Sequence, residues 1–316
     1  MEKIMLFAGS ASLELTQEIA RFLGITLSRS SVTRFADGEL KIKIEENIRG
    51  QDVFIVQSTN PPAENLMELL LFLDAAKRAS AERITAVIPY YGYARQDRKD
   101  EPRVPISAKL IADLLGVSGA HRVLTIDLHA EQIQGYFNIP VDHLYAAPVF
   151  IEYYHRKNIS DYVIVSPDAG RVNRVRAFAR RIGKDVPIAI IDKRRTGPNQ
   201  SKVINVIGEV KGKNAIIYDD MIDTGGTVVD AAGALAEKGA REIYVSAVHG
   251  LFSANALDRL ERSPIKEITV TNTVRFTREK MPEKLKILSI AELLAEAIKR
   301  IHNNESISSL FKEVEE

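Results

Sequence analysis

Short apolar runs alternate along the chain with longer segments in which apolar residues recur every three or four positions. The first pattern predicts a buried strand and the second an amphipathic helix. The expected strands are residues 4–8, 53–57, 84–88 and 123–128 in the first half, and 162–165, 188–191, 215–218, 243–248 and 268–271 in the second. The expected helices are residues 13–23, 64–78, 107–115, 173–182, 228–238 and 291–301. Such alternation predicts parallel sheets with helices on both faces.

The number of strands is sufficient for two sheets, and the two halves look like versions of one unit. In each half a strand leads into a helix rich in basic residues, at 52–78 and at 161–181, and a later strand ends in a polar loop. A chain of 316 residues also suits two domains. We therefore predict an α/β fold of two similar domains, residues 1–146 and 147–316, each a mostly parallel sheet flanked by helices.

Composition excludes several classes of protein. Lysine and arginine number 43 against 42 aspartates and glutamates, so no bulk charge attracts nucleic acid or a membrane surface. The absence of cysteine excludes disulfides, thiolate metal sites and a thiol nucleophile. No apolar stretch approaches the ~20 residues of a membrane span, and the first residues run straight into a strand-like segment. We expect a cytoplasmic protein without nucleic-acid or membrane partners.

The most informative stretch is residues 214–232, where a buried strand leads through carboxylates and a glycine pair into a helix. Glycines let the backbone approach a ligand, and a helix N-terminus favours a phosphate. Carboxylates instead repel phosphate and accept hydrogen bonds from sugar hydroxyls, so the stretch suits a phosphorylated sugar. The alternative is a plain turn with a threonine cap. The candidate residues are Asp219, Asp220, Asp223, Thr224, Gly225, Gly226 and Thr227.

A second polar loop, residues 92–99, follows the expected strand 84–88 and an aromatic pair. Arginine can fork onto phosphate oxygens, and a guanidinium or aromatic plane can stack on a purine. The alternative is a solvated run of charges. The residues that would contact a nucleotide are Arg95, Gln96 and Asp97.

Three more strands end in residues with possible chemistry. His129 follows the strand 123–128, and Asp168 follows the strand 162–165. The alternative to a functional role is that each is simply a polar residue at the end of a strand. Lys193 and Arg195 follow the strand 188–191 on a polar segment, where the alternative is a solvated surface.

In this order, these segments resemble the class I ribose-phosphate pyrophosphokinases over essentially the whole chain. Residues 214–232 resemble the phosphoribosyl-diphosphate signature that this family shares with type I phosphoribosyltransferases, and residues 92–99 resemble its ATP loop. The resemblance implies two type I phosphoribosyltransferase-like domains. It also implies transfer of a diphosphoryl group from Mg-ATP to the anomeric hydroxyl of ribose 5-phosphate, giving AMP and 5-phosphoribosyl 1-diphosphate.

The resemblance further implies a role for each candidate. Lys193 and Arg195 would be catalytic, and Mg²⁺ would be held by His129 and Asp168. ATP would contact Arg95, Gln96 and Asp97 of one subunit and Asp37, Gly38 and Glu39 of a neighbour. Ribose 5-phosphate would contact Arg195, Asp219, Asp220, Asp223, Thr224, Gly225, Gly226 and Thr227. The assembly would be a homohexamer with phosphate and ADP as effectors.

The chain departs from this pattern in the loop after Asp168, where Arg171 replaces one glycine of an expected pair. An arginine there either adds charge to a diphosphate site or points to solvent. Two other functions stay open. A salvage phosphoribosyltransferase would share residues 219–227 without needing the first half, and a non-catalytic homologue would lose the basic or metal-binding residues that this chain keeps.

Overall fold

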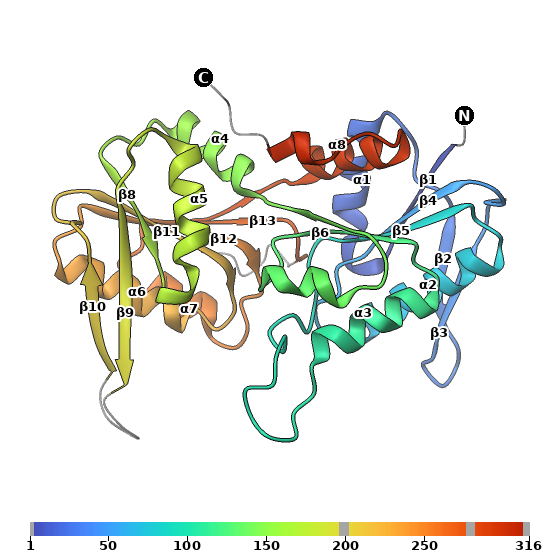
Figure 1. The fold of residues 1–316 in the computed structure, drawn as a ribbon, viewed down its shortest axis with the longest axis horizontal. Helices are drawn as coiled ribbons and strands as arrows, with labels where there is room; N and C mark the ends of the chain where they lie inside the picture. The colour runs from blue at the N-terminus through green and yellow to red at the C-terminus, as the bar shows by residue number, and fades with distance from the viewer. Residues whose placement is uncertain (1–2, 196–201, 276–281, 312–316) are drawn as a thin grey trace. The chain divides into compact units, whose positions relative to one another are not determined.

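The computed structural model describes residues 3–195, 202–275 and 282–311, except for the side chains of residues 193–195, 202–204, 309 and 311. The chain forms two compact units (Figure 1). The first unit contains Met1–Tyr145, Thr273–Arg275 and Ser289–Glu316, and the second contains Ala146–Asn272 and Phe276–Leu288.

The first unit is built on a five-stranded parallel sheet in the order β1-β4-β5-β6-β7. Its strands are β1 (Ile4–Ala8), β4 (Asp52–Val56), β5 (Arg83–Ile88), β6 (Arg122–Ile126) and β7 (Val141–Leu144). A separate antiparallel hairpin consists of β2 (Ser30–Arg34) and β3 (Leu40–Ile44). The helices are α1 (Leu13–Leu23), α2 (Glu64–Arg78), α3 (Ser107–Ser118) and α8 (Ala291–His302). Every residue of β4 is buried, as expected for a strand covered on both faces.

Helix α8 packs against α1 through an apolar face that includes Leu294, Ile298 and Ile301. The division expected from the sequence, between residues 146 and 147, placed this helix with the second half, whereas the compact units place it with the first. Burial of the apolar face against α1 brings the C-terminal helix into the first unit. The assignment of domains otherwise stays a prediction.

A buried carboxylate fastens the end of α8 to the first sheet. Asp52 is fully buried and accepts a hydrogen bond from Arg83 Nε at 2.9 Å. His302 Nδ1, at the end of α8, lies 2.8 Å from Asp52 Oδ2. Because a buried carboxylate is costly unless it is paired, these contacts make the position of α8 specific.

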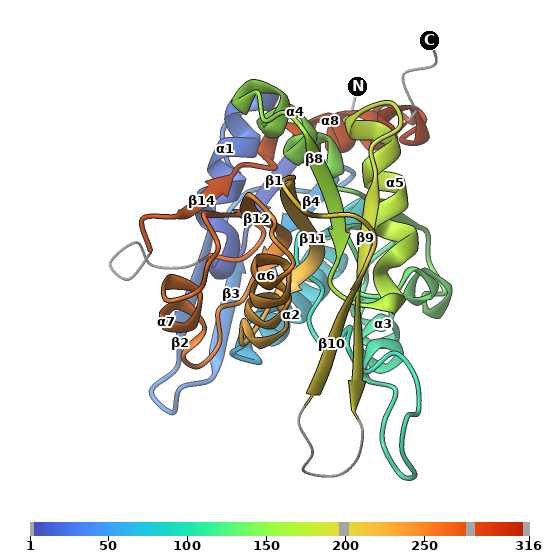
Figure 2. The same cartoon turned by 90° about the vertical axis from the view of Figure 1, so that its left-hand side faces the viewer.

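The second unit is built on a seven-stranded sheet in the order β10-β9-β8-β11-β12-β13-β14. All neighbours are parallel except β9 and β10. The strands are β8 (Tyr162–Ser166), β9 (Ile188–Arg195), β10 (Lys202–Ile207), β11 (Asn214–Ile222), β12 (Glu242–Gly250), β13 (Glu267–Thr271) and β14 (Leu285–Leu288). The helices are α4 (Ala147–Lys157), α5 (Val172–Ile182), α6 (Gly226–Glu237) and α7 (Ala256–Glu261). Helix α5 covers one face of this sheet and α6 the other (Figure 2).

Every expected strand and helix is present, and the fold class is confirmed; β9 and β11 extend furthest beyond their predicted bounds. β11 continues to Ile222 because its ladder with β12 continues, so Asp219 and Asp220 lie within the strand and not after it. β9 continues to Arg195 because β10 pairs with its residues 190–195. Among the described helices, none is both long and apolar enough to cross a membrane.

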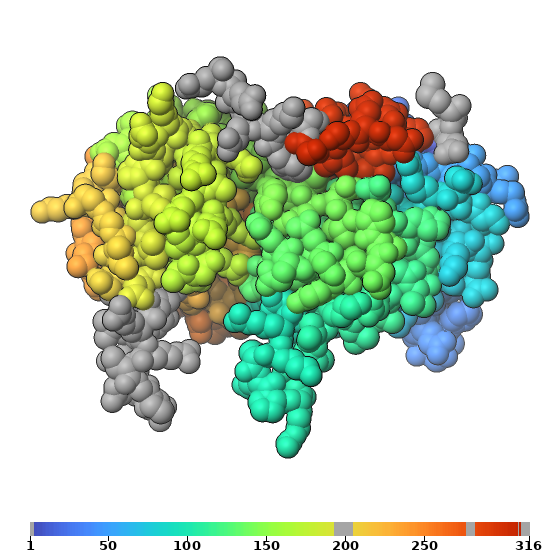
Figure 3. Space-filling model, in the orientation of Figure 1, coloured from blue at the N-terminus to red at the C-terminus, as the bar shows by residue number. Residues whose placement is uncertain are grey.

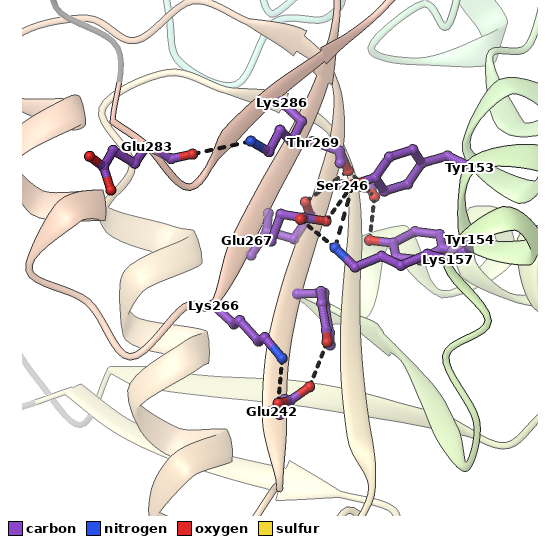
Figure 4. A network of polar contacts seen from close by, with 12 residues as sticks. Tyr153, Tyr154, Lys157, Glu242, Ser246, Lys266, Glu267, Thr269, Glu283 and Lys286 are labelled. Atoms are coloured by element: carbon purple, nitrogen blue, oxygen red, sulfur yellow. Dashed lines mark hydrogen bonds and ion pairs between the residues drawn. The ribbon is translucent and has the colours of Figure 1, made fainter.

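The strands of the second sheet begin at one edge, here called the amino edge, where α4 is attached by a buried polar network (Figure 4). Glu267 accepts a hydrogen bond from the Tyr153 hydroxyl at 2.7 Å and pairs with Lys157. The Tyr154 hydroxyl lies 2.9 Å from Ser246 Oγ, and burial is the main cause that raises the pKa of Tyr154. These contacts join α4 to β12 and β13.

Further out on the amino edge, other carboxylates also have cationic partners. Glu242 pairs with Lys266, and hydrogen bonding from Lys266 is the main cause that lowers the pKa of Glu242. Asp161 pairs with Lys213 at 3.0 Å and with Arg241 at 2.9 Å, and its pKa is lowered, chiefly by the Lys213 hydrogen bond. The amino edge is therefore a set of matched charges.

Candidate active site

The opposite edge of the second sheet, here called the carboxyl edge, contains a topological switch point. β8 and β11 are neighbours, but the chain continues from β8 to β9 on one side and from β11 to β12 on the other. The segments that leave the carboxyl ends of β8 and β11 therefore diverge. Ligands of open α/β sheets commonly bind at such switch points.

Two adjacent carboxylates lie in β11 beside this switch point. Asp219 is 7% exposed and Asp220 is 1% exposed. The backbone N–H of Asp220 donates a hydrogen bond to Asp219 Oδ1 at 2.8 Å. Burial raises the pKa of Asp219 well above its usual range, and the Asp220 charge raises it further, while the Arg171 guanidinium acts in the opposite direction. Two buried acids side by side are unfavourable for folding, which favours a functional interpretation.

Arg171 belongs to a short 3₁₀ turn after β8, Ala169–Arg171, and its side chain reaches the acid pair. Its Nη2 lies 3.2 Å from Asp220 Oδ1, and its Nε lies 3.7 Å from Asp219 Oδ1. The side chain is only 19% exposed. Its backbone N–H donates to Asp168 Oδ1 at 3.1 Å, so Asp168 caps the turn. The sequence did not predict this ion pair, because it joins residues about fifty positions apart.

The segment after β11 makes a tight turn into α6. Gly225 has a φ of +74°, a conformation that side chains other than hydrogen disfavour, and α6 begins at Gly226, two residues earlier than expected. A Cβ atom added at Gly226 would meet no atom of another segment closer than Arg259 Nη1 at 3.8 Å. The first-turn amides of a helix are not used by the helix itself, so this end of α6 is suited to a phosphate. Asp223 and Thr224 form the turn between strand and helix.

The candidate ATP residues lie in the first unit. Arg95 is exposed in the segment between β5 and α3, which projects from the surface of the unit (Figure 3). Asp97 is buried and accepts a hydrogen bond from Gln132 Nε2 at 2.8 Å. Gln96 Oε1 accepts a hydrogen bond from the Ser107 hydroxyl at the start of α3. Gln96 and Asp97 therefore also shape the loop, a role that the sequence did not predict.

The other candidates in the first unit are separate from this loop. Asp37, Gly38 and Glu39 are exposed at the tip of the β2–β3 hairpin, where Gly38 has a φ of +97°. His129 follows β6 and is half-buried in the first unit, whereas Asp168 belongs to the second. The backbones of Lys193 and Arg195 end β9, but their side chains lie outside the described part of the structure.

The first unit also contains a cavity of about 410 Å³ that the sequence did not reveal. It lies beside the β2–β3 hairpin and the start of α2, and its lining includes Ser10, Arg34, Pro62, Glu64, Asn65 and Glu68. Glu68 is buried and accepts the Ser10 N–H at 2.7 Å. Two glutamates make this cavity unfavourable for a phosphate, in contrast to the start of α6.

Comparisons with known proteins give one consistent result. The N-terminal domain of ribose phosphate pyrophosphokinase matches residues 4–119, and the phosphoribosyl synthetase-associated domain matches residues 189–312. A ribose-phosphate pyrophosphokinase of Caldanaerobacter subterraneus subsp. tengcongensis is 54% identical over 310 residues, and one of Bacillus subtilis is 52% identical over 311; each alignment covers 98% of both chains. The crystal structure of phosphoribosylpyrophosphate synthetase from Mycobacterium smegmatis has a TM-score of 0.89, with 44% identity over 96% of this chain and 100% of that one.

The fold, with its acid pair and glycine turn at a switch point, defines an α/β protein suited to a sugar phosphate or nucleotide. The chain belongs to the ribose-phosphate pyrophosphokinase family. Members of this family are transferases that form 5-phosphoribosyl 1-diphosphate and AMP from ATP and ribose 5-phosphate, in nucleotide biosynthesis. The chain is therefore an enzyme of this class, which excludes the interpretation as a salvage phosphoribosyltransferase.

Proposed function

We propose that ribose 5-phosphate binds at the carboxyl edge of the second sheet and that its anomeric hydroxyl attacks the β-phosphorus of ATP there. The observation that carries this proposal is the buried pair Asp219 and Asp220 beside the turn into α6. Hydroxyl acceptors and a phosphate-binding helix end are adjacent in the chain, which is the combination that a phosphorylated ribose requires.

In this arrangement the two ends of the sugar bind to different groups. Asp219 and Asp220 accept hydrogen bonds from the ribose hydroxyls. The turn Asp223–Thr227, with Thr224, Gly225 and Gly226 between, holds the 5-phosphate through backbone amides, and Arg195 assists. Separation of the acids from the amide groups keeps the carboxylates from repelling the phosphate.

ATP and its metal ion are assigned to residues of several loops. Arg95, Gln96 and Asp97 bind the nucleotide, together with Asp37, Gly38 and Glu39 of a neighbouring subunit. Mg²⁺ prefers oxygen ligands, so the carboxylate of Asp168 fits this ion, whereas the imidazole of His129 suits contact through a water molecule. When bound, Mg²⁺ neutralises phosphate charge. Lys193 and Arg195 stabilise charge on the diphosphoryl group as it transfers.

The proposed assembly is a cytoplasmic homohexamer that phosphate activates and ADP inhibits. The exposed tip of the β2–β3 hairpin supports it, because Asp37 and Glu39 are available to a neighbouring subunit. If the nucleotide site needs that neighbour, dilution to folded monomers abolishes activity. Sedimentation measured together with the assay tests this, and an active isolated monomer would contradict it.

The assay that tests the reaction measures AMP formed from ATP, with and without ribose 5-phosphate. The binding site is tested by comparing the affinities of ribose 5-phosphate and 2-deoxyribose 5-phosphate. Loss of a hydroxyl partner costs a buried acceptor ~1–3 kcal/mol, so the wild type should prefer ribose by roughly ten- to a hundredfold.

Two variants separate the two halves of the sugar site. Asp220→Ala should reduce the preference for ribose. Gly226→Val should weaken both sugars alike. A Cβ atom at this position meets no other segment closer than 3.8 Å, but a branched side chain would obstruct a bound phosphate. If both variants kept the wild-type ratio, the assignment of hydroxyls to Asp219 and Asp220 would be wrong.

A further inference from the structure

Arg171 makes contacts that bear on how the acid pair binds a sugar. Its guanidinium is 3.2 Å from Asp220 Oδ1 and 3.7 Å from Asp219 Oδ1, and its side chain is mostly buried. A buried arginine beside buried carboxylates differs from a surface ion pair, because water screens the charges much less.

The backbone around Arg171 determines where the guanidinium can reach. Asp168 Oδ1 accepts the Arg171 N–H at 3.1 Å and thereby caps the turn after β8. β8 lies next to β11, so a side chain that starts from this turn extends across the switch point to the neighbouring strand. The arginine therefore reaches the acids from the other side of the switch point at which the sugar is proposed to bind.

The acid pair needs such a partner. Two carboxylates that are 7% and 1% exposed repel each other, and burial favours protonation of one of them. The raised pKa of Asp219, opposed by Arg171, follows from the same geometry. A protonated carboxyl has one acceptor oxygen fewer for a hydroxyl than a carboxylate has.

We infer that Arg171 is a positioning residue that holds Asp219 and Asp220 as an oriented pair of carboxylates ready to accept the ribose hydroxyls. The inference rests on the proposed function of this pair as the hydroxyl site. It assigns to Arg171 a part in sugar specificity, in place of contact with a diphosphate or with solvent. Arg171 does not itself touch the reacting atoms.

The test measures binding of ribose 5-phosphate and of 2-deoxyribose 5-phosphate to the full-length enzyme by calorimetry. Arg171→Gln removes the charge and should lower the ribose-to-deoxyribose affinity ratio by about tenfold, since hydrogen bonds to charged groups are stronger than those to neutral groups. Arg171→Lys keeps the charge and should retain part of the ratio. Arg176→Gln, which removes an exposed arginine of the neighbouring helix α5, is the matched control and should leave the ratio unchanged.

A purely structural role predicts a different outcome, in which Arg171→Gln weakens both sugars equally and the ratio stays at the wild-type value. That result would overturn the inference, and so would tighter binding of ribose 5-phosphate, which would make Arg171 a competitor of the sugar. Asp220→Ala distinguishes failure of the Arg171 role from failure of the proposed hydroxyl site. If Asp220→Ala lowers the ratio and Arg171→Gln does not, only the role of Arg171 fails; if Asp220→Ala does not lower it, the hydroxyl site fails.

A double-mutant cycle keeps the test informative if a single variant is less stable. With Asp220 replaced by alanine, the additional change Arg171→Gln should alter the ratio by less than about twofold, because the two residues act on one interaction. Independent, multiplicative effects of the two substitutions on the ratio would contradict a shared role.

Discussion

The two edges of the second sheet treat their carboxylates in opposite ways. At the amino edge, Asp161 and Glu242 have lysine or arginine partners, and their pKa values are lowered. At the carboxyl edge, Asp219 is buried beside Asp220, and its pKa is raised well above its usual range despite the nearby Arg171. Carboxylates therefore stabilise the amino edge and destabilise the carboxyl edge.

The difference indicates how the sheet divides its tasks. Charged residues at the amino edge are matched within the protein and hold α4 to β12 and β13 (Figure 4). The acids at the carboxyl edge are buried side by side, and we propose that they accept hydrogen bonds from the ribose hydroxyls. Substitutions at the carboxyl edge should therefore change activity more than stability. Substitutions at the amino edge should change stability more than activity.

The largest expected effect is on turnover. Replacing Lys193 or Arg195 with alanine should lower kcat by about 10²–10³-fold and change ATP affinity far less, because these side chains are assigned to the transition state. Steady-state kinetics measure this. Lys211→Ala, at an exposed lysine in the turn before β11, is the control and should keep wild-type rates. Near-normal turnover in Lys193→Ala would remove it from the catalytic residues.

The next effect is on stability at the amino edge. Glu267→Ala should lower the free energy of unfolding by about 1–3 kcal/mol, since Tyr153 and Lys157 lose a largely buried charged partner. Urea denaturation measures the loss, and kcat should stay within twofold of wild type. Glu283→Ala is the control, because its backbone oxygen, which accepts from Lys286, is retained. A stable but inactive Glu267→Ala would erase the contrast between the edges.

A smaller effect of opposite sign is expected at the acid pair. Asp219→Asn should raise the midpoint of thermal unfolding at neutral pH, because it removes a buried charge that disfavours the fold. The raised pKa means that Asp219 holds its proton to higher pH in the native state than in the unfolded state. Its contribution to the stability of the fold is therefore lost as pH rises from the usual aspartate range through the raised pKa. The advantage of Asp219→Asn should therefore shrink as the pH is lowered toward the usual aspartate range. An advantage that grew in acid would show that burial of this charge is not the cause.

The smallest effect is expected for the exposed pair at the amino edge. Lys266→Gln should cost less than about 1 kcal/mol, because both side chains of the pair with Glu242 are partly in water. The lowered pKa of Glu242 means that its contribution is present above the ordinary glutamate range and disappears as pH falls through the lowered value. Denaturation of wild type and variant at neutral and acidic pH compares the two, and a loss that persisted in acid would point to the contact of the Lys266 ammonium with the Tyr244 ring.

The sequence predicted the framework of this sheet better than its active-site contacts. Apolar runs such as 215–218 locate buried strands, and the glycine turn before α6 is visible as a local motif. The half-buried hairpin β2–β3 and the edge strand β14 were missed, since they lack a continuous apolar run. The ion pair of Arg171 with Asp220 was also missed, because it depends on the pairing of β8 with β11 and no local pattern encodes it.

Helix α8, which packs on α1 and brings His302 to Asp52, affects the timing of folding during synthesis. The ribosome makes the first 145 residues well before it reaches Ser289, a delay of roughly seven to thirty seconds at common rates of synthesis. During that interval α1 lacks its partner and Asp52 lacks His302. The unit that begins the chain is therefore completed last, and the second unit has all of its strands before the first unit has its final helix.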